Sequence, residues 1–117
     1  MKKLTPLPKL LEKTQRIFNA YIRARDSHCI SCGGPVEQAG HYHSQGHHSA
    51  LRFDPINTNG QCRRCNMFLH GNLIKYRQGL VEKYGEDIVK ELEERANTDR
   101  LKKWSREELE ELITKYK

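Results

Sequence analysis

Apolar positions divide this chain into two helical ends and a polar middle. From Lys9 to Arg25 the apolar residues recur mostly at spacings of three, four and seven, which predicts an amphipathic helix. Between His28 and Gly71 the chain is rich in Gly, Cys, His, Asn and Gln, and its apolar residues are scattered. Because this middle segment offers little apolar surface to bury, something other than a hydrophobic core must hold it together.

Helical periodicity returns after Gly71 and is interrupted at Gly85. A last segment follows the turn-like sequence Asn97-Thr98-Asp99. There Ser105 and Glu108 have the spacing of a capping box, and the residues after them form one apolar helical face: Leu109, Leu112, Ile113 and Tyr116. The pattern therefore predicts two or three helices in the C-terminal part of the chain.

Charge is distributed unevenly along the sequence. The chain has 117 residues and a formal net charge of +6, from 21 Lys and Arg against 15 Asp and Glu. Residues 1–80 contain 12 of the basic residues and only 4 of the acidic ones. Such a surplus suggests an anionic partner, most often nucleic acid, although a solvated basic surface gives the same average. We expect any contact with a phosphate backbone in the first two-thirds of the chain.

Composition argues against a membrane protein. Hydrophobic residues make up 36% of the chain, the mean hydropathy is −0.87, and no apolar run approaches the length of a membrane span. Pro6, Pro8 and Lys9 interrupt the apolar stretch near the N-terminus, so it lacks the apolar middle of a secretory signal. We therefore expect a cytoplasmic location.

The four cysteines form two C-x2-C pairs, Cys29 with Cys32 and Cys62 with Cys65. Two such pairs are typical of a zinc site, in which each tight turn offers two thiolates. An all-cysteine tetrahedral site has no open position for a substrate, so the zinc ion would be structural and would close the polar middle segment. Two disulfides would need an oxidising compartment and a redox pair would need a thioredoxin-like context, and the chain indicates neither.

Five of the six histidines fall between Gly40 and His70. Zinc bound by four cysteines does not require them. Imidazoles beside basic residues suit general-base chemistry near neutral pH, a second metal ion, or both. For His47 and His48 a simpler interpretation is that they are solvated residues of a loop bounded by Gly and Ser.

The order of these residues resembles the HNH, or ββα-metal, nucleases, which carry a His on one strand, an Asn further on, and a helix that opens with C-x2-C-Asn. Here Asn57 follows His41 by 16 positions and Asn66 follows Asn57 by 9. The region from Cys29 to Leu92 more closely resembles the NinG (Rap) recombination proteins of lambdoid phages. The strings that carry this likeness are Cys29-x-x-Cys32-Gly33, Ala39-Gly40-His41-Tyr42, Leu51-Arg52-Phe53, Gln61-Cys62, Cys65-Asn66, His70-Gly71-Asn72 and Tyr76-Arg77.

The resemblance implies a role for each of three residues. His41 would be the general base that takes a proton from the attacking water, and Asn57 would hold the loop that orients its ring. Asn66, at the start of the helix, would bind a catalytic Mg²⁺ or Mn²⁺ that stabilises the leaving 3′ oxygen. Phosphodiester hydrolysis needs such a base, a Lewis acid and positive charge around the phosphate.

Gly40 departs from the family pattern, because many of these nucleases place a metal-binding Asp directly before the catalytic His. Either Asn66 holds the ion with few other protein ligands, as in some members of the wider fold, or another histidine supplies the missing ligand. His70, one helical turn after Asn66, is the first candidate. His43 is the second, since it lies two residues after His41 on the same side of a strand, and it could also exchange roles with His41.

The resemblance also implies a fold. It is a small α+β domain in which residues 1–27 form a basic helix, residues 28–84 form a zinc-stapled ββα-metal HNH core, and residues 85–117 form the C-terminal helices. For a phage protein, the expected cytoplasmic location is that of a bacterial or infected host cell.

We therefore predict a metal-dependent, structure-selective DNA endonuclease that hydrolyses phosphodiester bonds in branched recombination intermediates such as Holliday junctions or D-loops. This substrate class rests on the resemblance alone. We expect backbone contacts to DNA from four basic residues: Arg52, Arg63, Arg64 and Lys75. Symmetrical cutting of a junction needs two active sites, so we expect a homodimer through the apolar faces of the terminal helices. Whether a partner recombinase delivers the enzyme to DNA stays open.

Two other classes of protein fit part of the sequence. A non-catalytic, zinc-containing DNA-binding module of a phage recombination or replication complex would account for the charge and the cysteines. An RNA-binding zinc ribbon would do the same but lacks an evident aromatic platform. Neither explains why His41, Asn57 and Asn66 occur in register.

Overall fold

The computed structural model describes residues 4–117 and shows a small α+β fold with four α-helices and one two-stranded sheet, which confirms the predicted class. In chain order the elements are α1 (Leu7–Arg25), β1 (Gln38–His41), a 3₁₀ turn (Ser49–Leu51), β2 (Thr58–Gln61), one π-helical turn (Arg64–Phe68), α2 (Leu73–Tyr84), α3 (Glu86–Thr98) and α4 (Arg106–Tyr116). No helix among these residues is long and apolar enough to cross a membrane.

Local sequence explains where the helices begin and end. The first turn of α1 contains Pro8, whose missing N–H costs nothing there because that group would have no helical partner. Gly85 separates α2 from α3 with a φ of 94°, a conformation that favours glycine. At α4 the predicted capping box is confirmed: the N–H of Glu108 donates to Ser105 Oγ, and the N–H of Ser105 donates to the Glu108 carboxylate.

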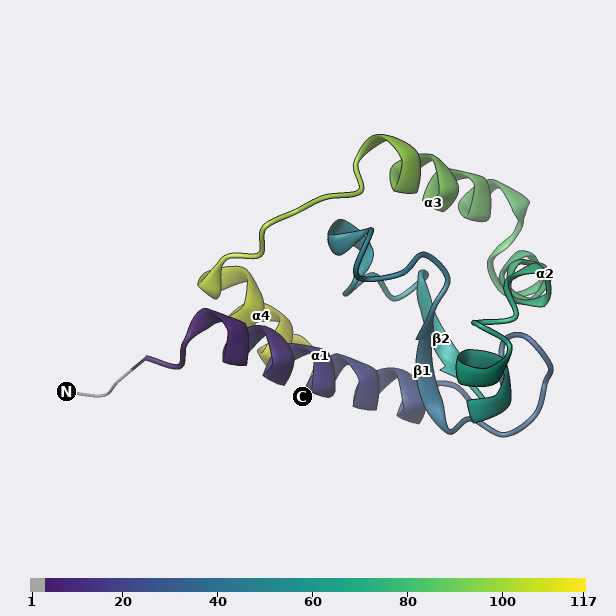
Figure 1. Cartoon of the computed structure of the whole chain (residues 1–117), viewed down its shortest axis with the longest axis horizontal. Coiled ribbons are helices and arrows are strands. Elements are labelled where there is room, and N and C mark those ends of the chain that lie inside the picture. Colours follow the sequence, from purple (N-terminus) through teal and green to yellow (C-terminus); the bar gives the residue numbers. More distant parts are fainter. Residues whose placement is uncertain (1–3) are drawn as a thin grey trace.

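Two apolar clusters lie on opposite sides of the hairpin (Figure 1). In the first, α4 packs against α1, where Phe18, Ile22 and Leu109 are fully buried together with Phe53 from the middle segment. In the second, α2 packs against α3 around buried residues that include Leu51 from the middle segment: Tyr76, Leu80, Val89, Leu92 and Ala96. Each fully buried large side chain contributes about 1.5–3 kcal/mol through the hydrophobic effect.

Strands β1 and β2 form an antiparallel pair in which Gly40 lies opposite Asn59 and His41 lies opposite Thr58. All four residues of β2 are buried, yet none of their side chains is apolar. The Asn59 amide shows how this is tolerated: its Nδ2 donates to the Ile56 carbonyl at 2.8 Å, and its Oδ1 accepts from the Lys83 ammonium at 3.0 Å. Hydrogen bonding therefore replaces apolar contact at the centre of the fold.

The segment after the second cysteine pair differs from the expected regular helix. The N–H of Leu69 donates to the Arg64 carbonyl at 2.9 Å, which makes one wide π-helical turn. The chain then breaks before α2, with positive φ at three successive residues: His70, Gly71 and Asn72. Asn66 and His70 consequently do not share a helical face, and this part of the prediction is wrong.

Candidate functional site

The four cysteines converge into one cluster between the hairpin and the π-helical turn. Their Sγ atoms all lie within 4.8 Å of one another, and those of Cys32 and Cys62 are 3.6 Å apart. A tetrahedral zinc ion with Zn–S bonds of about 2.3 Å would separate its sulfurs by about 3.8 Å. The arrangement therefore fits a zinc ion, and the four thiols could hold one as the sequence predicted.

The surroundings of the sulfurs act on their thiolate forms in opposite directions. The N–H of Cys65 donates to Cys62 Sγ at 3.4 Å, and Asn72 Nδ2 donates to Cys65 Sγ at 3.5 Å. Burial raises the pKa of Cys65 to about 12. For Cys29, burial acts to raise the pKa, but the backbone N–H groups of Cys62 and Cys32 outweigh it and the pKa falls. Zinc must displace any remaining thiol protons, so its affinity depends on pH.

His41 ends β1, and its ring is held by the backbone of the middle segment. The His41 Nε2 atom lies 3.0 Å from the carbonyl oxygen of Arg52. That carbonyl is an acceptor only, so Nε2 carries the proton and Nδ1 is left with a lone pair. No described residue forms a hydrogen bond with Nδ1 of His41, so this lone pair has no partner in the described part of the fold.

The His41 ring is also kept neutral. Burial lowers the pKa of His41 below its ordinary value of 6.5; the hydrogen bond to Arg52 opposes this shift, and the Arg52 charge adds to it. A neutral imidazole with a free Nδ1 is the form that a general base requires.

Asn57 is fully buried and braces the loop that follows His41. Its Oδ1 accepts from the N–H of His43 at 2.9 Å, and its Nδ2 donates to the carbonyls of His43 at 3.0 Å and Leu51 at 3.3 Å. One amide thus ties both backbone groups of His43 to the segment that precedes β2. This geometry suits the loop-holding role that the resemblance implies.

Asn66 lies on the other face of β1. An ideal Cβ placed on Gly40 would lie 2.9 Å from Asn66 Oδ1, and side chains alternate along a strand, so His41 leaves β1 on the opposite face. Asn66 Nδ2 donates to Gln38 Oε1 at 2.7 Å, and Gln38 shares the face of Gly40. The structure brings His41 together with Asn57, but not with Asn66.

Gly40 has no room for a larger residue. The same ideal Cβ would lie 1.8 Å from Oε1 of Gln61, whose side chain fills the space beside Gly40 and is fully buried. An aspartate at this position would require Gln61 to move. From the sequence alone Gly40 looks like a lost ligand. Gln61 could not be found there, because a polar residue next to a cysteine pair gives no signal of burial.

The two histidines expected to replace the missing ligand do not lie on the elements predicted for them. His70 is exposed and occupies the break before α2 with a φ of 50°. His43 lies past the end of β1, so it does not share a strand face with His41 as predicted. Its Nε2 is buried and has no hydrogen-bond partner among residues 4–117, and its ring centroid is 5.1 Å from that of His48.

Three of the four predicted DNA contacts are available on the surface. Arg63, Arg64 and Lys75 are exposed, and the first two belong to the turn that carries the second cysteine pair. Arg52 is half-buried instead, because its Nε donates to Gln15 Oε1 of α1 at 2.9 Å. It is therefore engaged within the fold.

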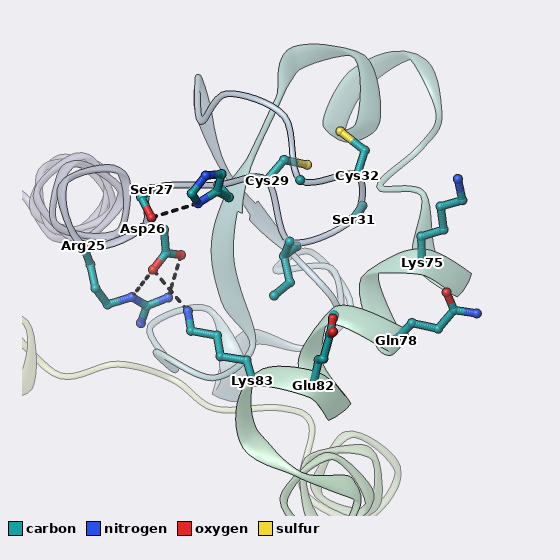
Figure 2. Close-up of a pocket in the computed structure, with 14 residues that line it drawn as sticks. Arg25, Asp26, Ser27, Cys29, Ser31, Cys32, Lys75, Gln78, Glu82 and Lys83 are labelled. Carbon is teal, nitrogen blue, oxygen red and sulfur yellow. Dashed lines mark hydrogen bonds and ion pairs between the residues drawn. The ribbon is translucent and has the colours of Figure 1, made fainter.

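A cavity lies outside the neighbourhood of His41, Asn57 and Asn66, none of which lines it. It has a volume of about 700 Å³ and is lined by the end of α1, the first cysteine pair and α2 (Figure 2). At one side Asp26 pairs with Arg25 at 2.6 Å and with Lys83 at 3.1 Å, and it accepts the N–H of Gly60 at 2.7 Å. These contacts join α1, β2 and α2, so Asp26 has a structural role that the sequence did not reveal.

Comparison with known proteins identifies the family. The family described as "Bacteriophage Lambda NinG protein" matches residues 1–117. The chain is 37% identical to "Protein ninG" of Escherichia phage 933W and 36% identical to the proteins of that name from Escherichia phage lambda and Salmonella phage P22. Each alignment covers 97% of this chain but only 56–57% of the relative, so the chain spans about half the length of these relatives. No solved structure matches it. The chain belongs to the NinG family.

Proposed function

We propose that this protein is a metal-dependent endonuclease of the HNH type, which hydrolyses phosphodiester bonds in branched DNA such as Holliday junctions and D-loops. The observation that carries the proposal is the state of His41: a neutral ring, fixed by its Nε2 hydrogen bond to Arg52, with Nδ1 free to accept a proton. A buried histidine that served packing alone would not need one ring nitrogen fixed by a hydrogen bond and the other left with a free lone pair.

The remaining parts of the reaction are assigned to residues around the hairpin. Asn57 would keep the His41 loop in place, and Asn66 would bind the catalytic Mg²⁺ or Mn²⁺. The ion would supply a Lewis acid for the leaving 3′ oxygen. The exposed Arg63, Arg64 and Lys75 would hold the DNA backbone without reading its sequence.

His41 and Asn66 leave opposite faces of β1, which constrains where a phosphate could lie. β1 pairs only with β2 among the described strands, so its other edge is unpaired. The face of β1 that carries His41 and the face beside Asn66 meet at this free edge. We therefore propose that the scissile phosphate lies along the free edge of β1, between His41 and Asn66.

The branched substrate and the dimer belong to the proposal as well. Two cuts in one junction require two active sites, hence two copies of the chain. The sequence suggested a dimer through the apolar faces of the terminal helices, but in this fold the apolar face of α4 is packed against α1. A dimer would have to use another surface.

The decisive experiment is nicking of branched and linear DNA by zinc-loaded protein with Mg²⁺ or Mn²⁺. We expect His41→Ala to lower the cleavage rate by about 10²-fold or more, because general-base catalysis contributes about 10²–10⁴-fold. The matched control is His47→Ala, since His47 is exposed in the nearby loop and should leave the rate unchanged. If DNA is bound but no divalent-dependent cleavage occurs, the protein is a non-catalytic zinc module instead.

A further inference from the structure

Two side-chain oxygens converge on the space beside Gly40. An ideal Cβ at that glycine would lie 1.8 Å from Gln61 Oε1, which comes from β2, and 2.9 Å from Asn66 Oδ1, which comes from the π-helical turn. The Gln61 side chain is fully buried, and its Oε1 accepts no hydrogen bond from any described residue. A buried carbonyl oxygen without a donor indicates a missing partner such as water or an ion.

The orientation of the Gln61 amide is fixed by its other end. Its Nε2 donates to the carbonyl of Gly71 at 2.8 Å and to Ser31 Oγ at 2.9 Å. Because a carbonyl can only accept, the nitrogen must face Gly71 and the oxygen must face Gly40. In Asn66, Nδ2 donates to Gln38 Oε1 at 2.7 Å, which leaves Oδ1 on the Gly40 side.

We infer that Gln61 Oε1 and Asn66 Oδ1 together bind a hard divalent cation, Mg²⁺ or Mn²⁺. The inference rests on the proposed function for the role of Asn66 and adds Gln61 as a ligand. Amide oxygens suit hard cations and not soft ones. Asn66 is half-buried, so it forms the open side of the site, whereas Gln61 forms the floor.

Both proposed ligands are neutral, which limits the affinity of the site for the ion. Mg²⁺ commonly takes few protein ligands and completes its shell with water and substrate phosphate oxygens. Two amides alone should therefore bind the ion weakly, and a DNA phosphate should strengthen the binding. By linkage, the ion would strengthen DNA binding by the same factor.

The test is a titration of the zinc-loaded full chain with Mn²⁺, followed by the NMR signals of the side-chain amides. Mn²⁺ broadens signals close to it, so we expect the NH₂ groups of Gln61 and Asn66 to disappear first. The built-in control is the pair Gln15 and Asn19 on α1, which bond to each other at 2.9 Å and should stay sharp. Broadening that starts elsewhere would overturn the inference. So would a direct hydrogen bond from a reversed Asn66 amide to Gln61 that Mn²⁺ does not disturb.

A second measurement uses Gln61→Met, which keeps the length of the side chain and removes its oxygen. We expect Mn²⁺ affinity, read from the EPR signal of free Mn²⁺, to fall by about tenfold or more. Gln15→Met removes another buried glutamine and should leave the affinity unchanged. If Gln61→Met does not fold, the titration of the natural chain decides. If Mn²⁺ binds at Gln61 but no DNA is cleaved, the proposed function is refuted and the cation site stands. If cleavage depends on Mn²⁺ but the Gln61 signal is undisturbed, the cation site is refuted and the proposed function stands.

Discussion

The helical ends and the polar middle of this protein are stabilised by different interactions. The ends bury apolar faces in two clusters, one between α1 and α4 and one between α2 and α3. The middle contains the four cysteines, the fully buried polar strand β2, and a few apolar residues that pack into the two clusters. Apolar contacts tolerate similar side chains, whereas thiolate and amide partners must be matched one by one. The candidate catalytic and metal-binding residues lie in the polar middle, where each polar group needs a particular partner.

The largest predicted effect is removal of the zinc site. Cys62→Ser, or a strong chelator, should unfold the middle segment, because structural zinc contributes about 10 kcal/mol or more in small domains. We expect the amides of β1 and β2 to lose hydrogen-exchange protection and zinc content to fall. Both helical clusters should also loosen, since Leu51 and Phe53 reach them from the middle segment.

The matched control for this change is Arg64→Ser, which places a serine in the same turn at an exposed position that is not a ligand. It should keep the zinc and the melting temperature. A Cys62→Ser protein with natural melting and zinc content would show that the middle does not depend on the metal.

A smaller effect is expected from the apolar side of the comparison. Phe18 is fully buried and packs edge-on against Phe53 at 5.9 Å and Tyr116 at 5.0 Å between ring centroids. Phe18→Ala should lower the free energy of unfolding by about 4 kcal/mol, measured by denaturant titration, through lost burial and the cavity left behind. Zinc content should not change, which would separate the two kinds of stabilisation.

Phe68 provides the control because it is the same residue type at 65% exposure. Phe68→Ala should change the free energy of unfolding by no more than about 0.5 kcal/mol. Equal losses for the two variants would mean that the α1–α4 cluster is not a core.

The smallest of the three effects concerns Asp26, which links the end of α1 to β2 and α2. Burial acts to raise the pKa of Asp26, but Arg25, the Gly60 N–H and Lys83 outweigh it, so the pKa lies below its ordinary value of 3.8. A lowered carboxylate pKa gives stability that is fully present above pH 3.8 and is lost as the pH falls through the folded-state pKa. Asp26→Asn should cost about 2 kcal/mol, the typical value of hydrogen bonds to a charged group.

Because Asp26 is ionised throughout the neutral range, this cost should be the same at pH 8 and pH 6 in chemical denaturation. Asp99→Asn, at an exposed position, should leave stability unchanged at both. If the stability cost of Asp26→Asn differed between pH 8 and pH 6, a titratable group other than Asp26 would be responsible for the pH dependence.

Much of the fold could be predicted because its signals are local. The helices followed from the period of apolar residues, the ends of α3 and α4 from turn and capping residues, and the cysteine cluster from two C-x2-C turns. The helix expected through Asn66 and His70 was wrong, because the cysteine turn and the backbone at His70, Gly71 and Asn72 form a wide turn and a break instead. Residue type alone does not distinguish that backbone from a regular helix.

The sequence by itself determined the cysteine pairs, the helices and the family, since each depends on spacings within one stretch of chain. Only the tertiary structure decided which polar residues are buried, on which face of β1 each candidate lies, and why position 40 is a glycine. These depend on contacts between β1, β2 and the π-helical turn. In sequence alone a polar strand such as Thr58–Gln61 resembles a loop, because its hydrogen-bonding partners belong to α1 and α2, which are distant along the chain. Gln61 is the clearest case, because its amide is oriented by Gly71 and Ser31, and no pattern along the chain indicates where its oxygen points.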